Sequence, residues 1–164
     1  MKNGILNSMG KLRYQVLVLG LGNLLMTDDG FGVLAAQILM QKAWPSGVAV
    51  MDIGTAAFYF WEEISLSRHV IAVDALRAGG KPGSIYRLSG ADIRHPPDGR
   101  RAAHGFTFPD VIALARKISG YPSGLLIYGV EPLDLRFGNP LSPVLKKTLP
   151  KVLAQVSGEI DRLL

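Results

Sequence analysis

Acidic side chains follow three apolar segments in the first half of the chain. Asp28 and Asp29 come after the first segment, Asp52 lies near the end of the second, and Asp74 ends the third. Parallel strands end at one edge of a sheet, so these carboxylates can converge although they are far apart in sequence. A charge at such an edge is costly unless it is paired, solvated or bound to a metal. We therefore expect a functional site there, with Asp29 and Asp74 flanking a crevice if the first and third strands are neighbours.

A histidine can complete this site. His104 stands directly before a predicted helix, in a loop that can reach the same edge. Two carboxylates in one crevice need a cation or a shared proton. With an imidazole they form an open site for a borderline divalent metal such as nickel or zinc. We take Asp29, Asp74 and His104 as the candidate ligands, and expect His69 to be structural and His95 to be solvated.

Each acid also has a structural interpretation. The position of Asp28 favours capping of the helix that follows the first strand. Asp52 is expected to accept hydrogen bonds from the backbone amides of the Gly54-Thr55 turn that follows it. Asp74 can pair with Arg77, three residues along the chain.

Strand-like and helix-like segments alternate along the chain. Apolar runs predict strands at residues 16–21, 48–53, 69–73, 84–88 and 125–130. Apolar positions at helical spacing predict helices near residues 31–38, 56–66, 107–120 and 143–163. Strands separated by helices predict an α/β fold, a three-layer sandwich in which a mostly parallel, twisted five-stranded sheet carries helices on both faces.

Local signals predict where some of these helices begin and bend. Thr55 is placed to cap the second helix. Thr107 and Asp110, with Pro109 near the first turn, resemble a capping box for the third. Pro150 lies inside the apolar stripe of the last helix and is expected to kink or split it.

Length and composition favour one domain at residues 16–164. Residues 1–15 are expected to be a flexible extension and not a secretory signal. No stretch approaches the roughly 18 apolar residues of a membrane span. The net charge of +5 comes with no nucleic-acid motif. The lack of cysteine fits a reducing cytoplasm, where we expect the protein to act without a membrane or nucleic-acid partner.

Several common chemistries lack their motifs. The turn at Gly20 and Gly22 has the first two glycines of GxGxxG, but Leu25 takes the third place and acids follow. The chain has no GxxxxGK[ST] and no GxSxG sequence, and it contains no cysteine nucleophile. We therefore expect no nucleotide cofactor and no serine or cysteine hydrolase.

Six sequence blocks together resemble the hydrogenase maturation protease family, from about residue 16 almost to the C-terminus. Their order and spacing are specific. The blocks are Gly20-Leu21-Gly22-Asn23 through Asp28-Asp29-Gly30-Phe31-Gly32-Val33, Asp52-Ile53-Gly54-Thr55, Val73-Asp74-Ala75 with the turn at residues 79–84, His104 with Asp110 and Leu114, Gly129-Val130-Glu131-Pro132, and Leu141-Ser142-Pro143.

The resemblance implies an endopeptidase that removes a C-terminal extension from the large-subunit precursor of a nickel–iron hydrogenase after nickel insertion. It maps the family's metal-contact and catalytic residues onto Asp29, Asp74 and His104. Family members carry Glu or Asp at the first position, so Asp29 fits with a shorter reach. The resemblance further implies that the substrate supplies the nickel. The size of the chain favours a monomer.

Two other functions stay open at this stage. A non-catalytic chaperone for the nickel site would keep the same ligands. A peptidyl-tRNA hydrolase-like enzyme would share the GLGN turn and suit the positive charge, but here Leu24 follows the turn and the first histidine is His69. Residues 94–101, RHPPDGRR, can contact a partner or form a solvated loop.

Overall fold

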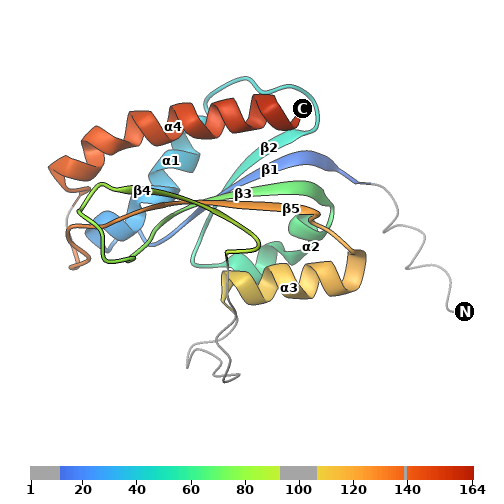
Figure 1. Ribbon diagram of the computed structural model, residues 1–164, viewed down its shortest axis with the longest axis horizontal. Coiled ribbons are helices and arrows are strands. Elements are labelled where there is room, and N and C mark those ends of the chain that lie inside the picture. Colours follow the sequence, from blue (N-terminus) through green and yellow to red (C-terminus); the bar gives the residue numbers. More distant parts are fainter. Residues whose placement is uncertain (1–11, 93–106, 139) are drawn as a thin grey trace, which may run out of the picture.

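A twisted five-stranded sheet lies at the centre of the protein, between two layers of helices (Figure 1). The computed structural model describes residues 12–92, 107–138 and 140–164. Within these ranges the strands are β1 (Tyr14–Leu21), β2 (Val48–Gly54), β3 (Ser67–Ala75), β4 (Ile85–Ser89) and β5 (Gly124–Val130). The helices are α1 (Phe31–Leu39), α2 (Trp61–Ser65), α3 (Phe108–Ser119) and α4 (Pro143–Leu163), with short 3-10 helices η1 (Thr27–Gly30) and η2 (Ala57–Phe60).

The strand order in the sheet is β2-β1-β3-β5-β4. All neighbouring strands are parallel except β4, which runs antiparallel to β5 at one edge. This confirms the predicted mostly parallel α/β sheet. β2 lies on one side of β1, whereas β3 and the later strands lie on the other side. The strand order therefore reverses between β1 and β3. Their carboxyl ends form a topological switch point, where ligands bind in such sheets.

Two apolar clusters cover the two faces of the sheet. Val16 and Val18 of β1 contribute to the cluster under α1 and α4, whereas Leu17 and Leu19 contribute to the cluster over α2 and α3. Side chains alternate across a strand, and all four of these are fully buried, so β1 is covered on both faces. This explains why its sequence is continuously apolar rather than alternating.

Two glycines let α1 lie directly on the sheet. A Cβ atom on Gly20 would overlap the backbone carbonyl of Gly32, and one on Gly32 would overlap the carbonyl oxygens of Val73 and Leu21. The close approach brings η1, which immediately precedes α1, to the carboxyl ends of β1 and β3. Gly20 and Gly32 therefore help to position Asp28 and Asp29, which lie between them in the sequence.

Some predicted boundaries and caps differ from the structure. β1 begins at Tyr14, inside the segment expected to be a flexible extension. The expected helix at residues 56–66 is divided into η2 and α2, and Thr55 does not cap it, because the residue before η2 is Ala56 and forms no side-chain cap. The capping box of Thr107 and Asp110 is confirmed.

Pro150 does not split the last helix. α4 is continuous over 21 residues with Pro150 inside it. Both Pro150 and Lys146, whose carbonyl loses its helical partner, are exposed, so water can hydrate that carbonyl. None of the helices in the described ranges is long and apolar enough to cross a membrane.

Candidate active site at the carboxyl edge of the sheet

Asp29 and Asp74 meet where β1 and β3 end. Asp29 lies in η1, and its Oδ2 accepts a hydrogen bond from the backbone amide of Asn23 at 2.9 Å. Asp74 is the penultimate residue of β3. The pKa of Asp74 is raised to about 7, first by burial and then by the charge of Asp29, while a bond from the Ala75 amide opposes the shift. β1 and β3 are neighbours, as this arrangement requires, and Asp29 lies close enough to Asp74 for its charge to act on it.

The turn that carries Asp29 depends on backbone conformations rare for most residues. Gly22 has a φ of +120°, and a Cβ there would overlap the carbonyl oxygen of Asp29. Thr27 has a φ of +39°, a strained value for a β-branched residue and typical of functional sites. The Asn23 side chain accepts from the amide of Leu25 at 2.9 Å, which closes the turn.

Asp28 does not cap α1, so that expectation was wrong. Its buried carboxylate accepts hydrogen bonds from the backbone amides of Leu133, Asp134 and Ser142 and from the Ser142 hydroxyl, at 2.8–2.9 Å. Ser142 is the residue before α4, so the negative charge lies at the N-terminus of that helix, where the helix dipole favours it. Asp28 therefore fastens the β1–η1 loop to α4, and its carboxylate is held by these structural bonds.

Asp52 also has a different partner from the one expected. Its Oδ2 accepts a hydrogen bond from the side-chain amide of Gln37 on α1 at 3.0 Å, whereas the expected donors were the amides of the turn at residues 54–55. The suggested pair of Asp74 with Arg77 is absent from the ion pairs of the described residues. His69 lies in β3, and burial, followed by the charges of Arg68 and Arg162, lowers its pKa.

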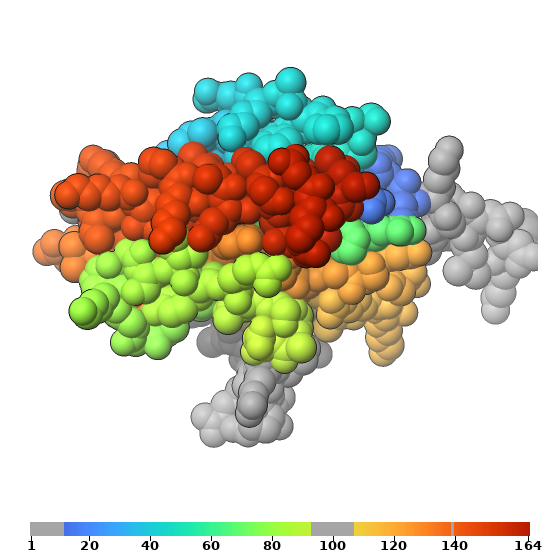
Figure 2. Space-filling view, turned by 45° about the horizontal axis from the view of Figure 1, so that its top comes forward, coloured from blue at the N-terminus to red at the C-terminus, as the bar shows by residue number. Residues whose placement is uncertain are grey.

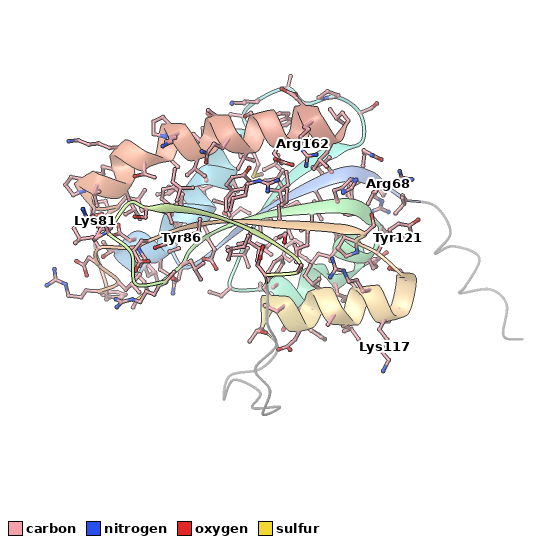
Figure 3. The ribbon with its side chains drawn as sticks, viewed as in Figure 1. Arg68, Lys81, Tyr86, Lys117, Tyr121 and Arg162 are labelled. Atoms are coloured by element: carbon pink, nitrogen blue, oxygen red, sulfur yellow. The ribbon has the colours of Figure 1, made fainter. Side chains whose placement is uncertain are left out.

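Glu131 is a residue of this edge that the sequence reasoning did not assign a role. It follows β5, and its Oε2 accepts from the amides of Ala78 and Gly80 and from the Tyr86 hydroxyl, at 2.8, 3.2 and 2.8 Å. These donors, the Ala78 amide first, lower its pKa. Figure 3 shows Tyr86 and Lys81 at the same end of the sheet. Glu131 thus holds the loop that begins directly after β3 and Asp74. The signal that could have found it is its place after the fourth parallel strand.

The predicted third ligand, His104, lies outside the described residues, as do His95 and residues 94–101. Within the described part of the chain no group of three or more His, Cys, Asp or Glu side chains could hold a metal. Asp29 and Asp74 alone offer two oxygen ligands. Because burial and mutual repulsion disfavour two charges here, the pair is arranged to take up a proton or a cation.

A groove lies away from these carboxylates. A groove of about 740 Å³ runs between β4 and α4, and Figure 2 shows part of β5 visible between these two elements. Arg87 and Glu159 line it and form an ion pair at 3.2 Å. A carboxylate with a raised pKa at a switch point, as Asp74 is, indicates chemistry more directly than a groove in which Glu159 is already paired with Arg87.

The fold and the carboxylate pair define an α/β protein with a candidate acid or metal site at a topological switch point. The model of the hydrogenase maturation protease family matches residues 33–159, which include Asp74 and His104 and begin after Asp29. The chain therefore belongs to the hydrogenase maturation protease family. This membership decides against the peptidyl-tRNA hydrolase alternative.

Individual relatives agree with this assignment. The chain is 35% identical over 139 residues to the hydrogenase expression/formation protein HupD of Thiocapsa roseopersicina, an alignment that covers 82% of this chain and 62% of that protein. It is 28% identical over 144 residues to the hydrogenase 2 maturation protease of Escherichia coli, which covers 87% and 88% of the two chains. The chain thus spans less than two thirds of the length of HupD but most of the second relative.

Solved structures show the same fold. The hydrogenase maturating endopeptidase HybD from E. coli superposes with a TM-score of 0.79 at 27% identity, over 90% of this chain and 92% of that one. The hydrogenase maturation protease HycI from Thermococcus kodakarensis superposes with a TM-score of 0.75 at 22% identity, over 94% and 97% of the two chains. The names of these relatives are those of proteases and endopeptidases, that is, of peptide-bond hydrolases.

Proposed function

We propose that this protein is an endopeptidase that removes the C-terminal extension of a nickel–iron hydrogenase large-subunit precursor after nickel insertion. The observation that carries the proposal is the facing pair of Asp29 and Asp74 at the switch point of a maturation-protease fold. The absence of cysteine from the chain removes the thiol route to peptide hydrolysis. Recognition of the substrate's own metal gives the carboxylates a role that suits their chemistry.

Asp29 and Asp74, together with His104, would contact the nickel that the precursor carries. An ion between the carboxylates replaces their mutual repulsion with attraction, so the cost of keeping Asp74 ionised falls when substrate binds. The amide of Asn23 fixes one oxygen of Asp29 and leaves the other available. The metal contact orients the scissile peptide, and the metal can polarise its carbonyl or activate water.

The remaining residues of the edge position this pair. Asp28 ties the β1–η1 loop to the start of α4, and Glu131 ties the loop after Asp74 to β5. These contacts fix the two loops that flank the carboxylates before substrate arrives. Preorganisation of this kind spares the reaction the cost of ordering the site.

Mass spectrometry of the large-subunit precursor from the same organism, incubated with the protein, tests the proposal. We expect loss of a C-terminal peptide from nickel-loaded precursor and no loss from nickel-free precursor. Asp29→Asn, Asp74→Asn and His104→Ala should each reduce cleavage at least ~100-fold. Asp52→Asn, an acid of the same edge that binds Gln37, is the matched control and should cleave normally.

A binding measurement on the same nickel-loaded precursor separates cleavage from a chaperone role. Tight binding of nickel-loaded precursor without any cleavage would support a non-catalytic nickel-site chaperone and contradict the proposed activity. Normal cleavage by the Asp29→Asn and His104→Ala variants would show that the assigned residues are wrong.

A further inference from the structure

Two loops at the carboxyl edge are joined side by side. One links β1 to η1, and the other follows β5; Figure 1 shows them together at the end of the sheet where α4 begins. The bonds between them run from the Asp28 amide to the Asp134 carbonyl at 3.0 Å, from the Gly138 amide to the Leu25 carbonyl at 2.8 Å, and from the Thr27 hydroxyl to the Arg136 carbonyl at 2.6 Å. With the bonds to the Asp28 carboxylate, they hold the two loops as one unit.

This unit presents large apolar side chains to solvent. The apolar rim, as we name it, consists of Leu24, Leu25, Leu133 and Phe137, which are 46%, 60%, 56% and 71% exposed. Backbone bonds fix the loops that carry them, so the rim cannot collapse into the core. A fixed group of exposed apolar side chains marks an interaction surface.

The rim continues into the carboxylate pair. The amide of Asn23, next to Leu24, donates to the Asp29 carboxylate at 2.9 Å. Gly30 lies against Leu24, since a Cβ on that glycine would be 3.1 Å from the Leu24 Cα. The Leu24 end of the rim therefore lies beside the turn that holds Asp29.

The loop that carries Leu133 and Phe137 also carries a charged pair. Arg136 lies between Leu133 and Phe137 in sequence, and its guanidinium pairs with Asp134 at 2.8 Å. An apolar centre with a polar border that includes arginine is the usual composition of a protein–protein interface. The pair is satisfied within the chain, which leaves the apolar groups to drive association.

We propose that the apolar rim docks an apolar face of the folded precursor beside its metal site. This inference rests on the proposed function and names the surface by which the protein grips its substrate. The occupant is the precursor rather than another protein, because the rim and the carboxylate pair form one continuous surface and a single partner must span both. The rim supplies affinity for polypeptide, whereas the carboxylates recognise the metal.

Leu25→Glu and Phe137→Glu variants test the proposal, with Met40→Glu as the matched control. Met40 is 53% exposed and follows α1 at the opposite edge of the sheet. With nickel-loaded precursor we expect each rim variant to raise KM about tenfold or more while kcat stays within about twofold. The control should match the unmodified protein, and melting temperatures should confirm that all three variants are folded.

Equilibrium binding to nickel-free precursor separates this inference from the proposed activity. The rim contacts polypeptide, so the rim variants should also lose about tenfold in this affinity. If the unmodified protein binds but never cleaves, and the rim variants lose binding, the rim is supported and the proposed activity fails.

Rim variants with unchanged KM and unchanged binding would overturn the inference, as would a protein that does not bind precursor at all. Dimers that Phe137→Glu dissociates without a change in KM would assign the rim to a second copy of the chain and also overturn it.

Discussion

At the scale of single residues, two adjacent acids have opposite roles. Among the described residues, fully buried Asp28 accepts four hydrogen bonds. Half-buried Asp29 accepts one there, and its charge acts on Asp74. The 3-10 turn of η1 directs neighbouring side chains to different sides, one toward α4 and one toward β3. Two neighbouring aspartates can therefore have different roles, because the role of a carboxylate depends on the groups that it contacts.

Asp74 should cost the folded protein stability at neutral pH. Its pKa is about 7 in the folded state against 3.8 in a model peptide, so the folded state holds the proton more tightly. Stability from this group is therefore full below about pH 4 and is lost as the pH rises through about 7. In metal-free protein we expect Asp74→Asn to raise the free energy of unfolding by about 1–3 kcal/mol at pH 8 and to change it little at pH 4.

Urea unfolding at the two pH values measures this effect. Asp161→Asn, an exposed acid on α4, is the control and should change stability by less than about 0.5 kcal/mol at either pH. Equal effects of Asp74→Asn at pH 4 and pH 8, or a loss of stability at pH 8, would contradict the argument. A stabilising substitution that abolishes cleavage would identify Asp74 as a residue kept for chemistry.

At the scale of elements, α1 packs with its backbone very close to the sheet. A Cβ on Gly32 would overlap backbone oxygens of Val73 and Leu21, which cannot move aside as a side chain can. Gly158 in α4 has open space around its Cβ position. We expect Gly32→Ala to destabilise the protein by about 3 kcal/mol or more. Gly158→Ala should stabilise it by about 0.5–1 kcal/mol, because alanine favours the helix.

Chemical denaturation of the two alanine variants checks this contrast directly. The substitution is chemically identical at both sites, so its opposite signs would isolate the effect of space. A Gly32→Ala protein as stable as the original would mean that α1 can lift from the sheet, and the position of η1 and Asp29 would then be adjustable.

Elements set by local signals were predictable from the sequence. The capping box of Thr107 and Asp110 involves residues three apart, and the buried strands follow from continuous apolar runs. The meeting of Asp29 and Asp74 was predictable because parallel topology brings strand ends to one edge.

Long-range partners were not predictable from the sequence. Asp28 binds Ser142, 114 positions along the chain, and Asp52 binds Gln37 across a helix–strand contact. Glu131 closes a loop whose amides lie 53 and 51 positions earlier. No local pattern encodes these pairs, because they exist only after the helices have packed on the sheet. Simple capping and turn interpretations of Asp28 and Asp52 failed for this reason.

At the scale of the whole molecule, the sheet couples the two apolar clusters. β1 and β3 contribute alternate residues to both, so neither cluster can form without the same central strands. The functional edge depends on the layer of α1 and α4: α1 carries η1 into place, and Asp28 ties that loop to the start of α4. We therefore expect the sheet and its helices to unfold together rather than face by face.

The chain provides its own probes of this cooperativity, because it has two tryptophans. Trp44 packs against the cluster under α1 and α4 and donates to the Leu39 carbonyl at 2.8 Å, whereas Trp61 packs against the cluster of the other face. Trp44→Phe leaves a reporter on one face and Trp61→Phe leaves one on the other.

In each variant we expect tryptophan fluorescence and far-ultraviolet circular dichroism to report one and the same urea midpoint. Because either substitution can shift overall stability, the comparison is between the two signals within a variant. A fluorescence midpoint that departs from the circular dichroism midpoint in either variant would mean that one layer of helices leaves the sheet first, and that the loops of the site can open without global unfolding.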